Sequence, residues 1–178
     1  MPASNKDRVY VALYARGGRD PDAFHWAIIV GPKKEGVGGS RGYRYHAIQR
    51  PDPSRTGHFI WVYEALEITL FQTNMLLGRI LIAKVTNDTQ LRTTLAAVPL
   101  VQDDPSWNCQ VWVKNAIAAL EADRKSLGTR VTDWTAIEQI ANGYINRKRE
   151  QRRYDGSGGW ASGTVPTFDL LENRESVS

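Results

Sequence analysis

Cysteine is the scarcest reactive residue of this chain, which has a single thiol, Cys109, in 178 residues. A single thiol cannot form an internal disulfide, so we expect the protein to work in a reducing compartment, the cytoplasm. The chain has only three histidines, and they are scattered. One cysteine and three such histidines lack the spacing of a metal-ligand set, so neither a metal nor another cofactor is predicted.

Long apolar runs are also missing. No stretch approaches the roughly 20 apolar residues that span a bilayer, and residues 1–7 lack the apolar core of a secretory signal. Hydrophobic residues still make up 42% of the chain, including six Trp and seven Tyr, which is enough for the core of one domain. We therefore expect a single soluble domain over residues 1–154. The glycine-rich and then acidic residues 155–178 predict a flexible or loosely docked tail.

The first half of the chain consists of short apolar segments separated by Gly- and Pro-rich turns, which is typical of strands. Strands are predicted at residues 8–15, 25–30, 43–48, 58–65 and 79–85. Because the connections between them are short, an antiparallel sheet of about five strands is favoured. The second half carries helical periodicity. Helices are predicted at residues 88–97, at 109–122, and after a cap at Thr132 or Asp133. The predicted fold class is therefore α+β, with the sheet packed against helices.

Cys109 opens the apolar stripe of the second predicted helix. The preceding residues 103–108 are rich in capping and turn residues, so the thiol lies in the first helical turn. Unpaired N–H groups and the helix dipole there lower the pKa of a thiol and can hold the oxyanion of a tetrahedral intermediate. A nucleophilic cysteine is one interpretation. The alternative is a small core residue on an apolar helix face.

A thiol nucleophile needs a base, and the only candidates are three histidines. His25 opens an apolar strand, where a side chain can reach the rim of a cleft. His46 follows across one glycine-rich connection, so it can lie on the neighbouring strand and orient the first ring. His58 begins another strand with no reactive residue nearby. For all three, a structural histidine is the alternative. Glu64 is expected on a solvated strand face.

These motifs resemble those of the lecithin:retinol acyltransferase-like family, which are circularly permuted relatives of the NlpC/P60 papain-like hydrolases. The resemblance rests on His-Trp-Ala-Ile-Ile-Val-Gly at 25–31, a histidine in the next strand, and Asn108-Cys109 opening a helix. It covers roughly residues 8–122 and marks the chain as a divergent member, similar to small fungal proteins with the same motif pair. The chain departs from the family pattern after Cys109, where Gln-Val-Trp replaces Glu-His-Phe. The gap between the two histidines is longer, and the hydrophobic C-terminal anchor of many phospholipid-acting members is missing.

The resemblance implies a papain-like fold and a role for each residue. His25 resembles the general base, His46 the residue that orients it, and Cys109 the acyl-accepting nucleophile. Tyr14, or else Tyr10, would add a hydroxyl to the oxyanion site. The implied reaction is hydrolysis, acyl transfer or a condensing step on a small-molecule acyl or amide substrate, through a thioester.

Two other functions fit the sequence. The same fold can serve as a non-catalytic domain that binds a small molecule or peptide. Alternatively, the basic run at 147–153 can engage RNA, although no aromatic residues are interleaved with it, and cations at a helix end also complement the helix dipole. Nucleic acid is therefore the less favoured partner. The oligomeric state stays open.

Overall fold

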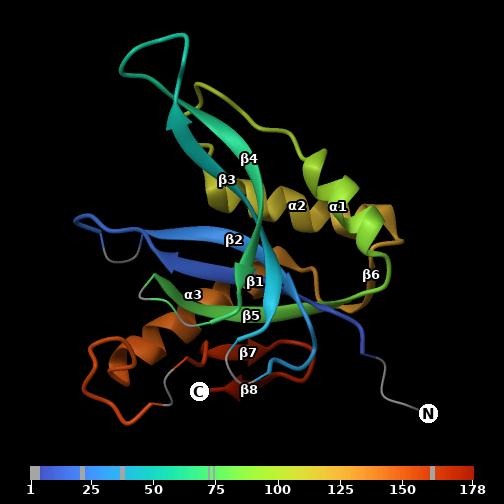
Figure 1. The fold of residues 1–178 in the computed structure, drawn as a ribbon, viewed down its shortest axis with the longest axis vertical. Helices are drawn as coiled ribbons and strands as arrows, with labels where there is room; N and C mark the ends of the chain where they lie inside the picture. The colour runs from blue at the N-terminus through green and yellow to red at the C-terminus, as the bar shows by residue number, and fades with distance from the viewer. Residues whose placement is uncertain (1–4, 21–22, 37–38, 72, 74, 161–162) are drawn as a thin grey trace.

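The computed structural model describes residues 5–20, 23–36, 39–71, 73, 75–160 and 163–178. The chain forms one sheet with three helices (Figure 1). In chain order the elements are β1 (Arg8–Ala15), β2 (Phe24–Gly31), β3 (Arg41–Pro51), β4 (Phe59–Thr69), β5 (Leu76–Val85), α1 (Asp88–Ala96), α2 (Cys109–Asp123), β6 (Leu127–Arg130), α3 (Trp134–Glu150), β7 (Thr167–Asp169) and β8 (Arg174–Val177). The predicted α+β class is confirmed.

The sheet is larger than predicted and is mixed. Its strand order is β4-β3-β2-β1-β5-β7-β8, and β6 pairs with β5 outside this path, so it has eight strands instead of about five. The pairs among β1 to β5 are antiparallel, as expected, but β7 runs parallel to β5. The three additional strands have only three or four residues each. Segments this short carry no readable alternation, which is why the sequence did not reveal them.

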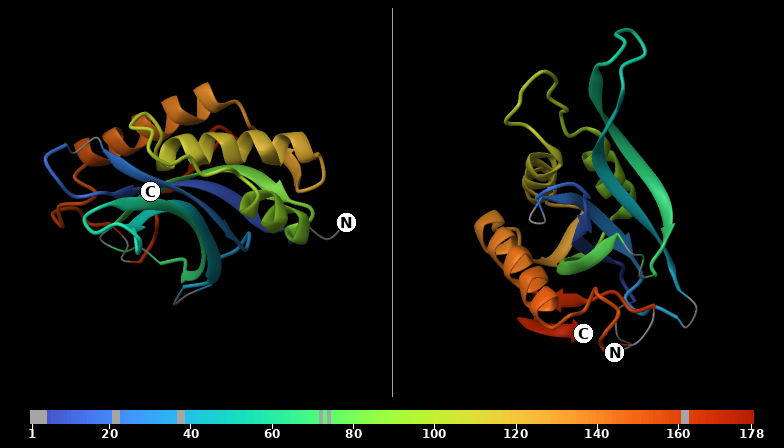
Figure 2. Two further views of the ribbon diagram at one scale, coloured as in Figure 1. Left: turned by 90° about the horizontal axis from the view of Figure 1, so that it is seen from above. Right: turned by 90° about the vertical axis from the view of Figure 1, so that its left-hand side faces the viewer.

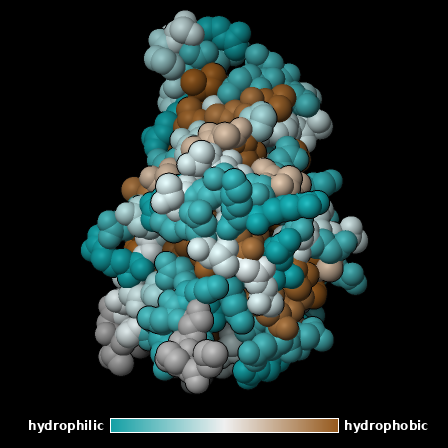
Figure 3. All heavy atoms as spheres, turned by 90° about the vertical axis from the view of Figure 1, so that its right-hand side faces the viewer, coloured by the Kyte–Doolittle hydropathy of each residue, from teal (hydrophilic) through white to brown (hydrophobic). Residues whose placement is uncertain are grey.

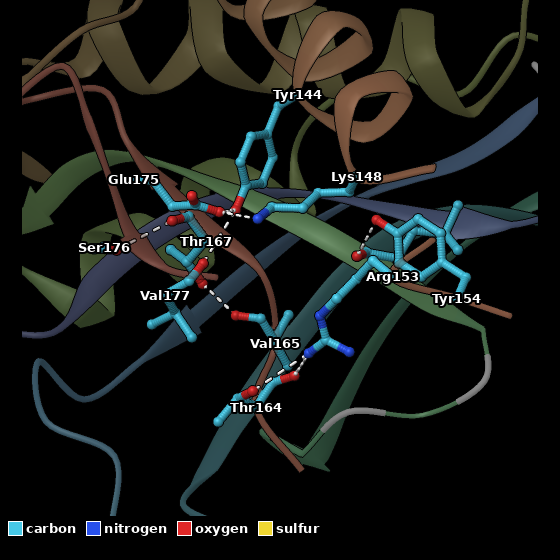
Figure 4. A network of polar contacts seen from close by, with 11 residues as sticks. Tyr144, Lys148, Arg153, Tyr154, Thr164, Val165, Thr167, Glu175, Ser176 and Val177 are labelled. Carbon is cyan, nitrogen blue, oxygen red and sulfur yellow. Dashed lines mark hydrogen bonds and ion pairs between the residues drawn. The ribbon is translucent and has the colours of Figure 1, made fainter. Parts of the chain in front are cut away.

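The C-terminal segment differs from the prediction of a loosely docked tail, because Thr167–Asp169 and Arg174–Val177 are strands of the sheet. Thr167 faces Val177 across the β7–β8 pair, while Arg79 of β5 faces Thr167 on the other side. The α3 residue Tyr144 donates its hydroxyl hydrogen bond to Glu175 at 2.7 Å and also lies 3.1 Å from the Val177 carbonyl oxygen (Figure 4). The polar strand β8 lies at the sheet edge, where exposed side chains give it the composition of a solvated tail.

The two faces of the sheet are covered differently. Helices α2 and α3 lie over one face (Figure 2). Alternate side chains of β1 point to opposite faces of the sheet. Val9, Val11 and Leu13 belong to the large core beneath the helices. Tyr10 and Tyr14 belong to a smaller cluster on the other face. Because loops and strand ends cover this second face, it has room for a cavity, described below.

Side-chain caps fix where the helices begin. Asn108 caps α2, and Asp133, one of the two predicted caps, accepts a hydrogen bond from Ala136 N at the start of α3. The predicted apolar stripe of α2 is confirmed. Its buried residues are Cys109, Trp112, Val113, Ala116, Ile117 and Leu120. Cys109 is therefore both the first residue of a capped helix and part of the core.

The hairpin of β3 and β4 projects from the body of the protein and braces the loop before α2 (Figure 1). Gln102 in this loop pairs with the Trp61 main chain, accepting from its N–H and donating to its carbonyl oxygen, both at 2.8 Å. The Trp61 and Trp107 rings pack edge to face at 5.2 Å. These contacts hold the loop, including Trp107 two residues before Cys109, against Trp61 of β4.

The surface drawn in Figure 3 is mainly hydrophilic, with apolar residues gathered toward the β3–β4 end of the molecule and again at the lower right of the view. Among the described residues, no helix combines the length and apolar character needed to cross a membrane.

Candidate active site

The site lies where two neighbouring strands separate. Strands β2 and β3 are paired only at residues 28–30 and 43–45, so the start of β2 has no partner on that side. His25 and His46 lie just beyond the last pair. His25 Nε2 and His46 Nδ1 are 2.7 Å apart, and their rings meet edge to face. The hydrogen bond between the histidines therefore spans the gap between the strands.

Cys109 enters this gap from the start of α2. The Asn108 side chain accepts hydrogen bonds from Gln110 N and Val111 N, at 2.9 and 3.1 Å, which orients the first turn. The Trp26 N–H, on the unpaired edge of β2, lies 3.5 Å from Cys109 Sγ. Only 2% of Cys109 is exposed. The sulfur thus lies against the peptide bond that joins Trp26 to the residue before it, His25.

The structure brings the thiol and the first histidine into adjacent positions without joining them directly. Within the described part of the chain, no hydrogen bond links Cys109 Sγ to a His25 ring nitrogen. His25 Nε2 is occupied by His46, so Nδ1 is the atom that would receive a thiol proton. Hydrogen bonds between catalytic groups are often long before substrate binds and shorten in the complex.

Glu64 extends the pair of histidines to a third residue. Its Oε1 lies 2.9 Å from His46 Nε2, and its Oε2 accepts from Arg50 Nη2 at 2.5 Å. A carboxylate only accepts, so His46 donates from Nε2 and accepts at Nδ1, and His25 in turn donates from Nε2. This chain of hydrogen bonds leaves His25 Nδ1 unprotonated, as a base requires.

The prediction that Glu64 lies on a solvated strand face did not include this role. A signal was present in the hairpin, because His46 and Glu64 are direct partners in the β3–β4 register. Counting outward from the observed strand ends, where Pro51 faces Phe59, pairs them, but the predicted ends at residues 48 and 58 would have paired position 46 with position 60. Opposite residues on one face of an antiparallel pair lie close enough to interact.

Burial determines the charge of both reactive groups. It lowers the pKa of His25 to about 4, with further lowering by His46, Arg44 and Arg16. Burial also raises the pKa of the Cys109 thiol, although the Trp26 N–H and the Arg16 guanidinium oppose this. The expectation that the helix start lowers the thiol pKa is therefore wrong for the resting protein, because desolvation outweighs the dipole. Thiol and imidazole are both neutral near pH 7.

The lowered pKa of His25 predicts a loss of stability in mild acid. Above pH 6.5 the ring is neutral in both the folded and the unfolded chain, so it has no effect there. Below pH 6.5 the unfolded chain binds the proton first, and the folded protein loses on the order of 2–3 kcal/mol as the pH falls to about 4. Urea unfolding at several pH values measures this.

The control for the stability measurement is another histidine. His25→Gln is expected to reduce the loss of stability between pH 6.5 and 4 without removing it, because burial also lowers the pKa of His46. His58→Gln changes an exposed residue outside this pair of histidines and serves as the control. Equal curves for wild type and His25→Gln would show that His25 does not bind its proton more weakly in the folded state.

A cleft of about 500 Å³ reaches the thiol between β2, α2 and α3. Its walls are mainly polar, with an Arg, a Glu, a Gln and three Asn. The lining residues are Arg16, Ala23, Phe24, Trp26, Asn108, Cys109, Gln110, Glu138, Asn142 and Asn146. His25 is not among them, because its ring lies on the side of the β2–β3 gap, where it is hydrogen-bonded to His46.

The two tyrosines considered as oxyanion donors are not brought to the thiol. Tyr14 faces His25 across the β1–β2 pair, with ring centroids 6.1 Å apart, but it does not line the cleft. Tyr10 lines the second cavity, where Arg79 stacks on it. In the described ranges, no three His, Cys, Asp or Glu side chains are grouped so as to hold a metal ion.

The basic run at 147–153 is partly built into the core. Lys148 is 2% exposed and forms an ion pair with Glu175 of β8. Arg153 is also buried and donates to the Thr164 carbonyl oxygen at 2.9 Å (Figure 4). Two cations of the proposed RNA-binding surface thus tie α3 to the C-terminal segment.

The fold and the site together define an α+β protein in which a buried thiol lies on the Trp26 N–H, one residue from the His25 of a Glu–His–His chain, where two strands of the sheet separate. The chain belongs to a family of unknown function, DUF6914, whose model matches residues 6–177. No curated protein and no solved structure matches the chain. The family match extends through β8, in agreement with a sheet that includes the C-terminal strands.

Proposed function

We propose that the protein is a cysteine-dependent acyl-transfer enzyme on a papain-like fold, similar to the permuted NlpC/P60 and lecithin:retinol acyltransferase-like proteins. Cys109 is the nucleophile, His25 the base and His46 the residue that positions the base. The observation that carries the proposal is that Cys109 Sγ lies on the N–H of Trp26, the residue after His25, whose ring is hydrogen-bonded to the His46–Glu64 pair.

The reaction begins from neutral partners. As Sγ attacks the acyl carbonyl carbon, the thiol proton passes to His25 Nδ1, and the carbonyl electrons move to oxygen. When the tetrahedral intermediate collapses, the bond to the leaving group breaks, and His25 returns the proton to that group. The product is a thioester on Cys109, which water or an amine resolves by the same route in reverse.

The backbone supplies the oxyanion donor in this proposal. The Asn108 side chain occupies the N–H groups of Gln110 and Val111, which leaves that of Cys109 outside the capping interaction. An N–H at the start of a helix is oriented toward developing negative charge. The Trp26 N–H, already on the sulfur, is the second candidate.

The polar walls of the cleft favour a polar acyl or amide substrate over a lipid chain. Gln110 and Glu138 are joined by a hydrogen bond of 2.6 Å, and Asn142 and Asn146 extend the polar wall along α3. Arg16 adds a cation at the cleft that interacts with Cys109 and His25. A substrate with a carboxylate or peptide-like amides would find partners here.

The second candidate is a non-catalytic binding domain that uses the same cleft. It is favoured by the nearly complete burial of Cys109 and by the raised pKa of its thiol. Both are ordinary properties of a core cysteine.

Incubation with an N-acylamino acid p-nitrophenyl ester tests the two candidates. We expect intact-mass spectrometry to show one added acyl group, located on Cys109 by peptide mapping and absent from the Cys109→Ala variant. The ester is activated, so an acylated lysine also appears in controls and does not count. If Cys109 becomes acylated only after unfolding in urea, the enzyme proposal fails and the binding domain replaces it.

A further inference from the structure

A second cavity, of about 690 Å³, lies on the face of the sheet away from α2 and α3. Its apolar side is formed by Tyr10 of β1 and Leu81 of β5, together with Leu70 and Val165 from the segments that cover this face. The segment around residues 33–36 and the β7–β8 region form its walls. This volume is in the range of cavities that bind small organic molecules.

Arg79 is one of three buried polar residues that line this cavity, with Arg8 and Thr167. It is 3% exposed, and three contacts hold its guanidinium in place. Nε donates to Thr167 Oγ1 at 2.9 Å, Nη2 forms an ion pair with Glu35, and the group lies over the Tyr10 ring, 4.2 Å from its centroid. Figure 4 shows Thr167 beside Val165 and Ser176 at this end of the sheet.

The remaining nitrogen of Arg79 has no partner. Nη1 is buried and makes no hydrogen bond with any described residue. A buried guanidinium N–H without an acceptor costs free energy, and native structures leave few such groups unexplained. Arg79 lines the cavity and its other contacts fix the guanidinium, so an acceptor in the cavity can pair with Nη1 once the side chains that cover this atom shift.

The charges around the cavity favour an acceptor with a single negative charge. Arg8 and Lys33 line it without an ion pair among the described residues, and Arg174 is paired with Glu172. Four cations and three carboxylates line the cavity, giving a formal charge of +1. These residues are Arg8, Lys33, Arg79, Arg174, Glu35, Asp169 and Glu172. A dianion would face the nearby carboxylates with less compensation than a monoanion.

We propose that this cavity binds a small organic monocarboxylate. One carboxylate oxygen accepts from Arg79 Nη1, Lys33 lies on the approach to the cavity, and the apolar part of the ligand rests against Tyr10 and Leu81. A charge-assisted hydrogen bond to a fixed guanidinium is among the stronger polar contacts in proteins. The site is separate from Cys109, because its lining residues share none with the thiol cleft.

Calorimetric titration of the full chain carrying Cys109→Ala with phenylacetate tests this site independently of the thiol chemistry. We expect saturable binding of one equivalent, at least tenfold tighter than that of neutral phenylacetamide and tighter than that of phenyl phosphate. Glu35→Gln should strengthen phenylacetate binding about threefold, because it removes a carboxylate that competes for the guanidinium. Arg79→Met should weaken binding at least tenfold.

If Arg79→Met fails to fold, Lys33→Met provides a second test of the cavity. This exposed substitution is expected to weaken phenylacetate binding about twofold or more without changing the fold. In wild-type protein, the Arg79 Nε–Hε resonance should shift on titration with phenylacetate and not with phenylacetamide. Equal affinity for acid and amide, preference for the phosphate, or full binding by folded Arg79→Met would overturn the proposal.

Discussion

Replacing His25 with alanine is expected to slow acylation of Cys109 by a factor of about 10² to 10⁴, the usual contribution of a positioned general base. The thiol pKa is raised by burial, so little thiolate exists at neutral pH without proton transfer to a neighbour. In the proposed mechanism His25 is this neighbour, and its pKa of about 4 keeps the ring neutral, and so free to accept a proton, at pH 7. The measurement is the initial rate of p-nitrophenol release under single-turnover conditions.

The pH dependence of the same rate gives an independent check. Protonated His25 cannot act as a base, so the rate is expected to fall as the pH decreases through about 4 and to stay level between pH 5 and 7. A thiol that reacts only through its own ionisation would instead lose a factor of ten per pH unit throughout this range.

Three histidine or carboxylate variants separate the roles. His46→Ala and Glu64→Gln act through the orientation of His25. Each is expected to lower the acylation rate of Cys109 about tenfold to a hundredfold and to leave the affinity for the ester nearly unchanged. His58→Ala, at an exposed residue outside the hydrogen-bonded chain, should behave as wild type. A His25→Ala variant that reacts at the wild-type rate would exclude His25 as the base.

The elements that sequence analysis placed well are those with a repeated pattern. Strand β1 has the predicted bounds, and α2 ends within one residue of its prediction. Both are central elements whose apolar residues recur at a fixed period over two or more turns or alternations. Strand β6 lacks this length, and the parallel pairing of β7 with β5 depends on a crossover through α3 that no local pattern encodes.

The site was predictable only in part, for a related reason. The sequence suggested that His25 and His46 lie on neighbouring strands, and in the structure His25 Nε2 and His46 Nδ1 are 2.7 Å apart. It did not reveal that β2 and β3 separate at this point and admit the start of α2. The separation leaves the Trp26 N–H without a strand partner and free to contact Cys109 Sγ, which is a property of the assembled sheet.

Removing the carboxylate of Glu175 is expected to have the largest effect on stability among the ion-pair variants. Lys148 is 2% exposed, so its ammonium group cannot regain water when its partner is lost. Breaking a buried ion pair on one side costs about 3–5 kcal/mol. Because the Glu175 side chain is about one-third exposed, we expect about 2–4 kcal/mol for Glu175→Ala in urea unfolding.

The matched variants show whether the buried charge is the cause. Lys148→Met replaces the cation with an apolar chain of similar length, so the free energy of unfolding should stay within about 1 kcal/mol of wild type. Adding Glu175→Ala to Lys148→Met should then cause almost no further loss of stability. Glu172→Ala removes an exposed partner of Arg174 and is expected to cost less than about 0.5 kcal/mol. If Glu175→Ala were as mild as Glu172→Ala, Lys148 would not depend on β8, and the C-terminal strands would be less firmly docked than this ion pair implies.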